Sequence, residues 1–170
     1  MLRPATNEYH EYFDAYIELF QADDLLAEFA AQPRKLEELL GELSHEEASQ
    51  LHTPYTWNLK QVVGHLLDTE RIFSNRLLRI AAGDPTPNPG FEQNDYVDNF
   101  DYSAVAMKDL LEEFAALRLS NLKLVSRCSE EQLSRQAMAS GKSLSARAAF
   151  FILGGHVVHH LEIMKQRLSG

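Results

Sequence analysis

The chain has a single cysteine, Cys128, so it cannot form a disulfide bond within itself. A lone thiol also excludes the zinc sites that are built from several cysteine thiolates. Any metal ion must therefore be bound through nitrogen and oxygen ligands. Scarce cysteine is typical of proteins in a reducing compartment, and we expect a cytoplasmic location.

Long hydrophobic runs and an excess of positive charge are also lacking. The longest apolar run, residues 148–153, ends at two glycines, whereas a transmembrane helix needs about 20 apolar residues. We therefore expect neither a membrane span nor a secretion signal. The 16 Lys and Arg residues are outnumbered by 25 Asp and Glu residues, which gives a formal net charge of −9. Because this charge repels phosphate backbones, nucleic acid is not an expected partner.

Apolar residues recur at helical spacing through most of the chain, and no stretch shows the sustained alternation of a half-buried strand. We therefore predict a single all-α domain spanning residues 1–170. A short extra helix is expected near the N-terminus, at residues 8–20. Four longer helices are expected at residues 24–43, 58–82, 103–127 and 143–168.

Local signals mark the starts of two of these helices. Asp23 or Asp24 can accept hydrogen bonds at the start of the helix at 24–43, and Asn58 with Gln61 forms a capping-box pattern. Pro33 lies inside the first of these helices, so we expect it to kink or divide that helix.

A proline-rich segment, residues 83–101, separates the second and third long helices. These 19 residues can extend about 60 Å, which exceeds the roughly 37 Å length of a 25-residue helix. The chain can therefore return along the bundle and begin the third helix parallel to the second. With short connections elsewhere, this predicts an up-down-down-up four-helix bundle with a long crossover loop. A lid over a site is the alternative role for the loop.

Three histidines lie among apolar residues in two of the predicted helices. His65 follows Gly64 in the second long helix, and His156 and His160 are one turn apart in the last. A buried imidazole is costly to desolvate without a partner, and the i, i+4 spacing lets two imidazoles reach one ion. Antiparallel packing brings all three to similar heights. We predict a divalent metal site; the alternative is core histidines hydrogen-bonded to carbonyl or carboxylate oxygens.

Four neighbouring residues are candidates for further roles. Asp68, one turn after His65, is a candidate catalytic base, fourth ligand, acceptor that orients an imidazole, or solvated acid. Glu92, in the proline-rich segment, is a second candidate base. Arg76 binds an anionic substrate, reaches solvent or pairs with an acid. His159 is expected beside the site or on the surface.

Several segments together resemble the DinB-like superfamily of damage-inducible proteins, which is related to YfiT-type hydrolases and to bacillithiol or mycothiol S-transferases. The segments are residues 57–71 (WNLKQVVGHLLDTER), 76–84, 90–97 (GFEQNDYV) and 154–168 (GGHVVHHLEIMKQRL). The resemblance implies the up-down-down-up bundle. It also implies His65, His156 and His160 as ligands of a divalent ion, often nickel or zinc.

The resemblance implies a metal-dependent hydrolase or a thiol S-transferase that acts on a small molecule, with a low-molecular-weight thiol as a candidate substrate. Three protein ligands leave a coordination position where water or a thiol becomes a nucleophile at neutral pH. The alternative is a non-catalytic stress-response or binding module whose metal is structural or lost, so enzymatic activity is left open. The aromatic segment near the N-terminus is expected to cover the bundle, and a homodimer contact is the alternative.

Overall fold

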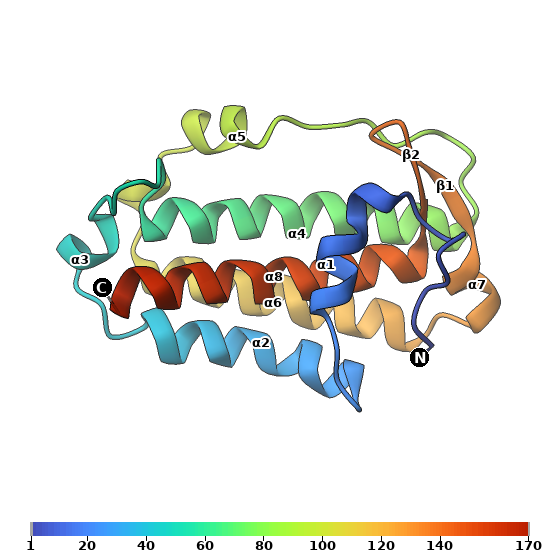
Figure 1. Cartoon of the computed structure of the whole chain (residues 1–170), viewed down its shortest axis with the longest axis horizontal. Helices are drawn as coiled ribbons and strands as arrows, with labels where there is room; N and C mark the ends of the chain where they lie inside the picture. Colours follow the sequence, from blue (N-terminus) through green and yellow to red (C-terminus); the bar gives the residue numbers. More distant parts are fainter. Residues whose placement is uncertain (1, 170) are drawn as a thin grey trace.

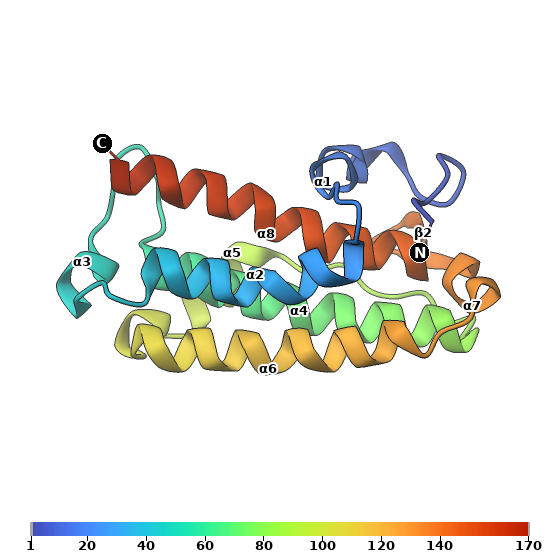
Figure 2. The same cartoon turned by 90° about the horizontal axis from the view of Figure 1, so that it is seen from below.

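The computed structural model describes residues 2–169 and shows four long helices packed lengthwise (Figure 1). They are α2 (Leu25–Leu40), α4 (Leu59–Ala82), α6 (Met107–Ser126) and α8 (Ala146–Ser169). Followed along the chain, α2 and α8 run in one direction, and α4 and α6 run in the other (Figures 1 and 2). The predicted up-down-down-up bundle is confirmed. In the described part of the chain, no helix has the length and hydropathy that crossing a membrane requires.

The crossover between the parallel helices α4 and α6 runs back along the bundle, as the sequence predicts (Figure 1). It contains α5 (Gln93–Asn99) and the 3-10 turn η2 (Tyr102–Ala104). Gly83 ends α4 in the left-handed region, with a φ of 79°, which is a common way for a helix to stop. The predicted start of the third helix at residue 103 is wrong, because the 3-10 turn occupies that position and α6 begins at Met107.

The predicted capping residues begin α2 and α4. The Asp24 carboxylate accepts hydrogen bonds from two amides of the first turn of α2. Asn58 and Gln61 bond each other's backbone amides, both at 3.0 Å. Helix α2 continues through Pro33, so the chain is not divided there. Packing of its buried residues, among them Phe29, stabilises the helix although the proline lacks an amide hydrogen.

The residues before α2 cover one side of α8 (Figures 1 and 2). They form the 3-10 turn η1 (Glu11–Phe13) and the helix α1 (Asp14–Leu19), so the predicted helix at 8–20 is shorter than expected. A Cβ atom on Gly155 would lie 1.8 Å from the carbonyl oxygen of Tyr16. Only glycine permits this approach, and the backbone of α1 therefore packs directly on the backbone of α8.

A small antiparallel sheet departs from the predicted absence of strands. It pairs β1 (Gln136–Ala139) with β2 (Lys142–Ser145), and β2 leads directly into α8. Ser140 and Gly141 form the turn with φ angles of 52° and 72°. Two successive residues at positive φ are typical of the type I′ turn, which matches the twist of a two-stranded hairpin. Strands of four residues are too short to show a clear alternation of apolar and polar residues in the sequence.

The hairpin also holds the crossover in place. The Asn88 amide donates to the Met138 carbonyl at 2.8 Å, and the Ser140 amide donates to the Asn88 carbonyl at 3.0 Å. The segment that follows Asn88 therefore lies beside the turn of the hairpin. Two further short helices, α3 (His45–Ser49) and α7 (Glu130–Ser134), complete the described chain.

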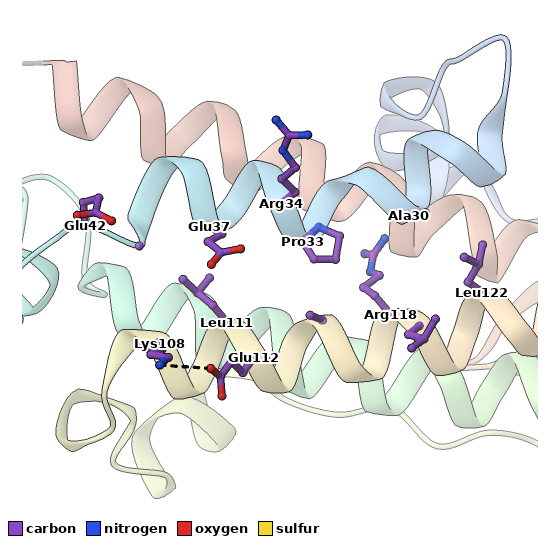
Figure 3. Close-up of a pocket in the computed structure, with 13 residues that line it drawn as sticks. Ala30, Pro33, Arg34, Glu37, Glu42, Lys108, Leu111, Glu112, Arg118 and Leu122 are labelled. Carbon is purple, nitrogen blue, oxygen red and sulfur yellow. Dashed lines mark ion pairs between the residues drawn. The ribbon is translucent and has the colours of Figure 1, made fainter.

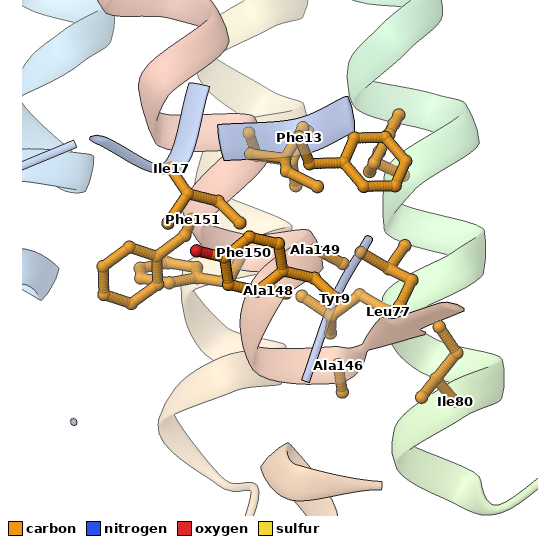
Figure 4. Close-up of a cluster of buried hydrophobic side chains, with 14 of the residues drawn as sticks. Tyr9, Phe13, Ile17, Leu77, Ile80, Ala146, Ala148, Ala149, Phe150 and Phe151 are labelled. Carbon is orange, nitrogen blue, oxygen red and sulfur yellow. The ribbon is translucent and has the colours of Figure 1, made fainter. Parts of the chain in front are cut away.

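The hydrophobic core consists of two clusters along the bundle. The cluster near the hairpin contains side chains of α1, α4 and α8, among them Ile17, Leu77 and Phe150 (Figure 4). The other cluster includes Leu59 of α4 and Leu161 of α8. On α4 and α8 the two clusters are separated by residues 68–71 and 154–156. The buried polar residues of these segments form a polar belt across the middle of the bundle: Asp68, Thr69, Glu70 and His156.

Candidate metal centre

His65 of α4 meets His156 and His160 of α8 at one point in the middle of the bundle. The Nε2 atom of His156 lies 3.0 Å from that of His65 and 3.1 Å from that of His160. One ring nitrogen from each of the three residues lies within 4.8 Å of the other two. The structure thus brings together the three residues that the sequence analysis selects.

The environment keeps the three imidazoles neutral. His65 is 3% exposed and His156 is 6% exposed. Burial, and to a smaller extent the nearby His159, lowers the pKa of His65 to about 4. The pKa values of His156 and His160 lie well below the usual range, first because of burial and then because of neighbouring histidines. At neutral pH each ring therefore offers a lone pair, which is the form that binds a metal.

The donor chemistry of this cluster fits a divalent ion. A neutral imidazole has one N–H donor and one acceptor nitrogen, so three Nε2 atoms that face one another cannot all be satisfied by mutual hydrogen bonds. An ion placed between them would accept a lone pair from each. The Nδ1 atom of His65 is also buried without a hydrogen-bond partner among residues 2–169. Imidazole ligands suit zinc and nickel among the common divalent metals.

Acidification is expected to destabilise the metal-free protein. His65 has a pKa of about 4 in the folded state and about 6.5 in the unfolded chain, so the unfolded state binds more protons between these values. The contribution of His65 is complete above pH 6.5 and is lost as the pH falls toward 4. The 2.5-unit difference corresponds to about 3 kcal/mol. Urea unfolding with a chelator at pH 7.5 and pH 4 measures this loss.

A substitution separates the effect of His65 from that of other titrating groups. His65→Gln should reduce the pH dependence of the free energy of unfolding by about 3 kcal/mol over this interval. The control is His10→Asn, because His10 is exposed and asparagine can replace it as the N-terminal cap of η1. An equal pH dependence in His65→Gln and the wild type would show that His65 is not held neutral by burial.

Asp68 lies near His65 on α4 but is bonded to another partner. Its Oδ1 atom accepts a hydrogen bond of 2.6 Å from the hydroxyl of Tyr102, and Oδ2 is buried without a partner in the described chain. Burial raises the pKa of Asp68, although the Tyr102 hydrogen bond opposes this effect. A Cβ atom on Gly64 would lie 2.2 Å from the Tyr102 ring, so that ring packs against α4 beside His65. The sequence analysis did not select Tyr102.

Aromatic rings surround the three histidines. The centroid of Tyr16 lies 5.4 Å from that of His156 and 5.7 Å from that of His159, and both contacts are edge-on. The ring centroid of Trp57 lies 5.1 Å from that of His65. His159 is half-buried against Tyr16 and is not part of the metal-ligand cluster found in residues 2–169. Tyr16 was missed because its contact with α8 depends on how α1 folds back.

A cavity of about 310 Å³ opens beside His65 and His156. It is enclosed by α1, α4, the crossover, the turn of the hairpin and α8. Arg76 and Glu92, two of the candidate residues, line it, whereas Asp68 is not among the lining residues. The crossover therefore both connects two helices and forms part of the cavity wall.

Two other cavities differ in their relation to the histidines. One of about 310 Å³ reaches His160 and is lined by Trp57 and Arg167. Another, of about 540 Å³, lies between α2 and α6, with Pro33 on one side and the Lys108–Glu112 ion pair on the other (Figure 3). No histidine lines this larger cavity, so its size does not make it the candidate site.

A buried ion pair between Glu70 and Arg118 lies in the polar belt. Arg118 of α6 and Glu70 of α4 are each 1% exposed, and the Arg118 Nε atom donates to Glu70 Oε2 at 3.0 Å. Asn121 donates to the other oxygen of Glu70 at 2.6 Å. Both carboxylate oxygens are therefore bonded, which buried charges require.

The same network holds the backbone of α8 close to His156. Arg118 Nη2 donates to the Leu153 carbonyl at 2.6 Å, and its Nη1 atom donates to Gln32 of α2. Gln32 in turn donates to the Gly154 carbonyl at 2.9 Å. Four helices are thus joined at the level of the metal centre. Sequence pattern does not indicate this network, because its members are far apart in the chain.

Comparison with known proteins agrees with the fold. Among solved structures that match, YfiT from Bacillus subtilis is described as a probable metal-dependent hydrolase with an unusual four-helix bundle topology. It has a TM-score of 0.73 and 15% identity, over 99% of this chain and 94% of that chain. The mycothiol-dependent maleylpyruvate isomerase has a TM-score of 0.64 and 15% identity, over 81% of this chain and 57% of that chain. Such low identities establish the shared fold alone.

A search of curated proteins finds no match. A family model described as the DinB superfamily matches residues 28–164, a range that includes all three histidines. The family resemblance found in the sequence is confirmed. The chain belongs to the DinB superfamily.

Proposed function

We propose that this protein is a metal-dependent enzyme, a hydrolase or a thiol S-transferase, that acts on a small molecule in the cytoplasm. His65, His156 and His160 would hold one divalent ion, zinc or nickel. The observation that carries the proposal is the convergence of three neutral imidazoles, two of which, His65 and His156, line a cavity of about 310 Å³. Ligand sites in proteins begin at about this size.

Three protein ligands leave a coordination position, at which a bound ion lowers the pKa of water or of a thiol and so supplies a nucleophile. The residues around the cavity would bind and orient the substrate. Of the two candidate bases we favour Glu92, because it lines the cavity. Asp68, with one oxygen bonded to Tyr102, would instead hold the Tyr102 ring beside His65.

The descriptions of the similar structures support a metal-dependent hydrolase and the use of a thiol. One structure is described as a probable metal-dependent hydrolase and the other as a mycothiol-dependent isomerase. The alternative function, a binding module with a structural ion, would require a fourth protein ligand. In the described part of the chain, only the three histidines form a cluster that could hold a metal. This supports a site with a free coordination position.

Substitution of Co²⁺ into the protein tests for that position. Small thiols and azide are expected to change the visible absorption of the Co²⁺ protein, because they bind where no protein group does. The zinc or nickel form should hydrolyse small esters or amides, or transfer a thiol such as cysteine to an alkylating reagent. A chelator should abolish this turnover, and added metal should restore it.

The same measurements can contradict the proposal. If the protein binds one Co²⁺ ion and neither thiols nor azide alter its spectrum, the coordination sphere is closed. That result would favour the non-catalytic binding module. His159→Ala is the matched control, since it removes a histidine from α8 outside the cluster and should respond as the wild type does.

A further inference from the structure

We infer that the cavity beside His65 and His156 selects small molecules that carry an anionic group, a carboxylate or phosphate, and that Arg76 and Lys142 bind this group. The inference rests on the proposed function in one respect only: the end of the ligand that lies at the histidines is taken to be the end that reacts. The anion-binding residues belong to α4 and β2 and are not metal ligands.

Arg76 is a buried cation without an acidic partner. It is 3% exposed, and no carboxylate among residues 2–169 lies within ion-pairing distance of it. Arg118, which is 1% exposed, has a carboxylate oxygen of Glu70 at 3.0 Å from its Nε atom. Burying a charge without compensation costs several kcal/mol. The contrast indicates that the counter-ion of Arg76 is supplied by a ligand.

The hydrogen bonds of Arg76 orient it and leave donors free. Its Nη2 atom donates to the Pro89 carbonyl and to Ser140 Oγ, both at 2.8 Å. The contact between the crossover and the hairpin holds both acceptors in place. Among the described residues, Nη1 and Nε have no hydrogen-bond partner. A guanidinium fixed in this way can still donate to the oxygens of a carboxylate or phosphate.

The charge of the cavity lining is opposite to that of the whole chain. Lys142 is a second cation in the lining, with its Nζ atom 4.5 Å from the centroid of Tyr12. The single acidic residue in the lining is Glu92. Its carboxylate is exposed and bonded to Asn94. Two cations against one acid, in a chain of net charge −9, favour an anionic ligand.

The remaining lining suits an apolar body with one polar group. Phe73 and Phe91 lie beside the guanidinium of Arg76, with ring centroids 4.6 and 5.8 Å from its central carbon. Thr69 lies on α4 between His65 and Phe73, and its buried hydroxyl has no partner in the described part of the chain. A bound ligand whose anionic group contacts Arg76 can therefore extend along the two aromatic rings and the Thr69 hydroxyl to the histidines.

Aromatic probes of matched shape and different charge test the inference. Benzoate, phenyl phosphate and the neutral benzamide are titrated into the full-length protein and followed by NMR. The titrations are made with and without metal, because the carboxylate of benzoate can also coordinate a metal ion at the histidines. In both forms benzoate or phenyl phosphate should bind at least about tenfold more tightly than benzamide, a difference of about 1.4 kcal/mol. Comparison of the two anions shows which one the site prefers.

Variants of α4 assign the selectivity to Arg76. Arg76→Gln should weaken anion binding about tenfold and leave benzamide binding unchanged, and Arg76→Lys should retain part of the anion affinity. The matched control is Arg71→Gln, since Arg71 lies on the same helix but is exposed and paired with Glu113. Unchanged anion affinity in Arg76→Gln would overturn the inference.

The wild-type protein alone also decides the question if the variants fail to fold. Equal affinity for benzoate and benzamide in the metal-free wild type would overturn the inference. This outcome is distinct from failure of the proposed function, because a protein can bind metal without selecting anions. Conversely, the metal-free protein can select anions even if the three histidines bind no metal ion, so that result supports the inference whatever becomes of the proposed function.

Discussion

Replacement of His65, His156 or His160 by alanine is expected to remove the divalent ion from the protein. The wild type should bind one ion per chain, and each variant should retain less than a tenth of that amount after gel filtration. Three ligands are the minimum found in catalytic zinc sites, and even outer-shell substitutions weaken binding 10- to 100-fold. Loss of a direct ligand should therefore cost more than about 100-fold in affinity. Elemental analysis and calorimetric titration with zinc measure both quantities.

The control for this experiment comes from the same turn of α8. His159→Ala removes an imidazole that is half-buried against Tyr16 and lies outside the cluster, so it should keep full metal content. Circular dichroism would show that all four variants are folded. Unchanged metal content in the three cluster variants would mean that the ion, if bound, is held elsewhere.

Replacement of Arg118 by methionine is expected to destabilise the protein by about 3–5 kcal/mol, the largest effect on stability that we predict. The substitution leaves the Glu70 carboxylate buried without its cation and removes the donor to the Leu153 carbonyl. Replacing Glu70 by leucine as well should recover part of the loss, because no uncompensated charge then remains. Urea unfolding of the metal-free proteins measures the three free energies.

An exposed ion pair provides the comparison for this buried one. Arg71 and Glu113 pair on the surface, where both side chains are more than 40% exposed. Arg71→Gln should therefore change the free energy of unfolding by less than about 1 kcal/mol. If Arg118→Met changed stability by no more than Arg71→Gln, the network would not contribute to the fold. A double variant less stable than Arg118→Met would mean that the unpaired Glu70 carboxylate is not the cause of the loss.

The features that depend on local sequence could be predicted. The period of the apolar residues identifies the four long helices, and Asp24 and Asn58 mark two helix starts because capping bonds reach only two or three residues along the chain. The histidine cluster also follows from helix geometry, since one turn separates His156 from His160 and antiparallel packing sets the height of His65.

The features that depend on contacts across the fold could not be predicted. Glu70 and Arg118 lie 48 residues apart. A charged residue in a helix is usually exposed, and nothing in the local sequence marks either of these two as buried. Tyr102 is 34 residues from Asp68, and the 3-10 turn that places it has no strong sequence signal. The hairpin was missed because four-residue strands carry too few side chains to show a period.

The elements that surround the cavity have a consequence for how such a protein can change. All three histidines belong to α4 and α8, whose positions are set by the two hydrophobic clusters and the network around Arg118. Much of the cavity surface comes instead from α1, the crossover and the hairpin turn, which lie outside the four long helices. Substitutions, insertions or deletions in those segments can change ligand preference while the three imidazoles keep their positions. New specificities can therefore arise without a change in the four-helix bundle.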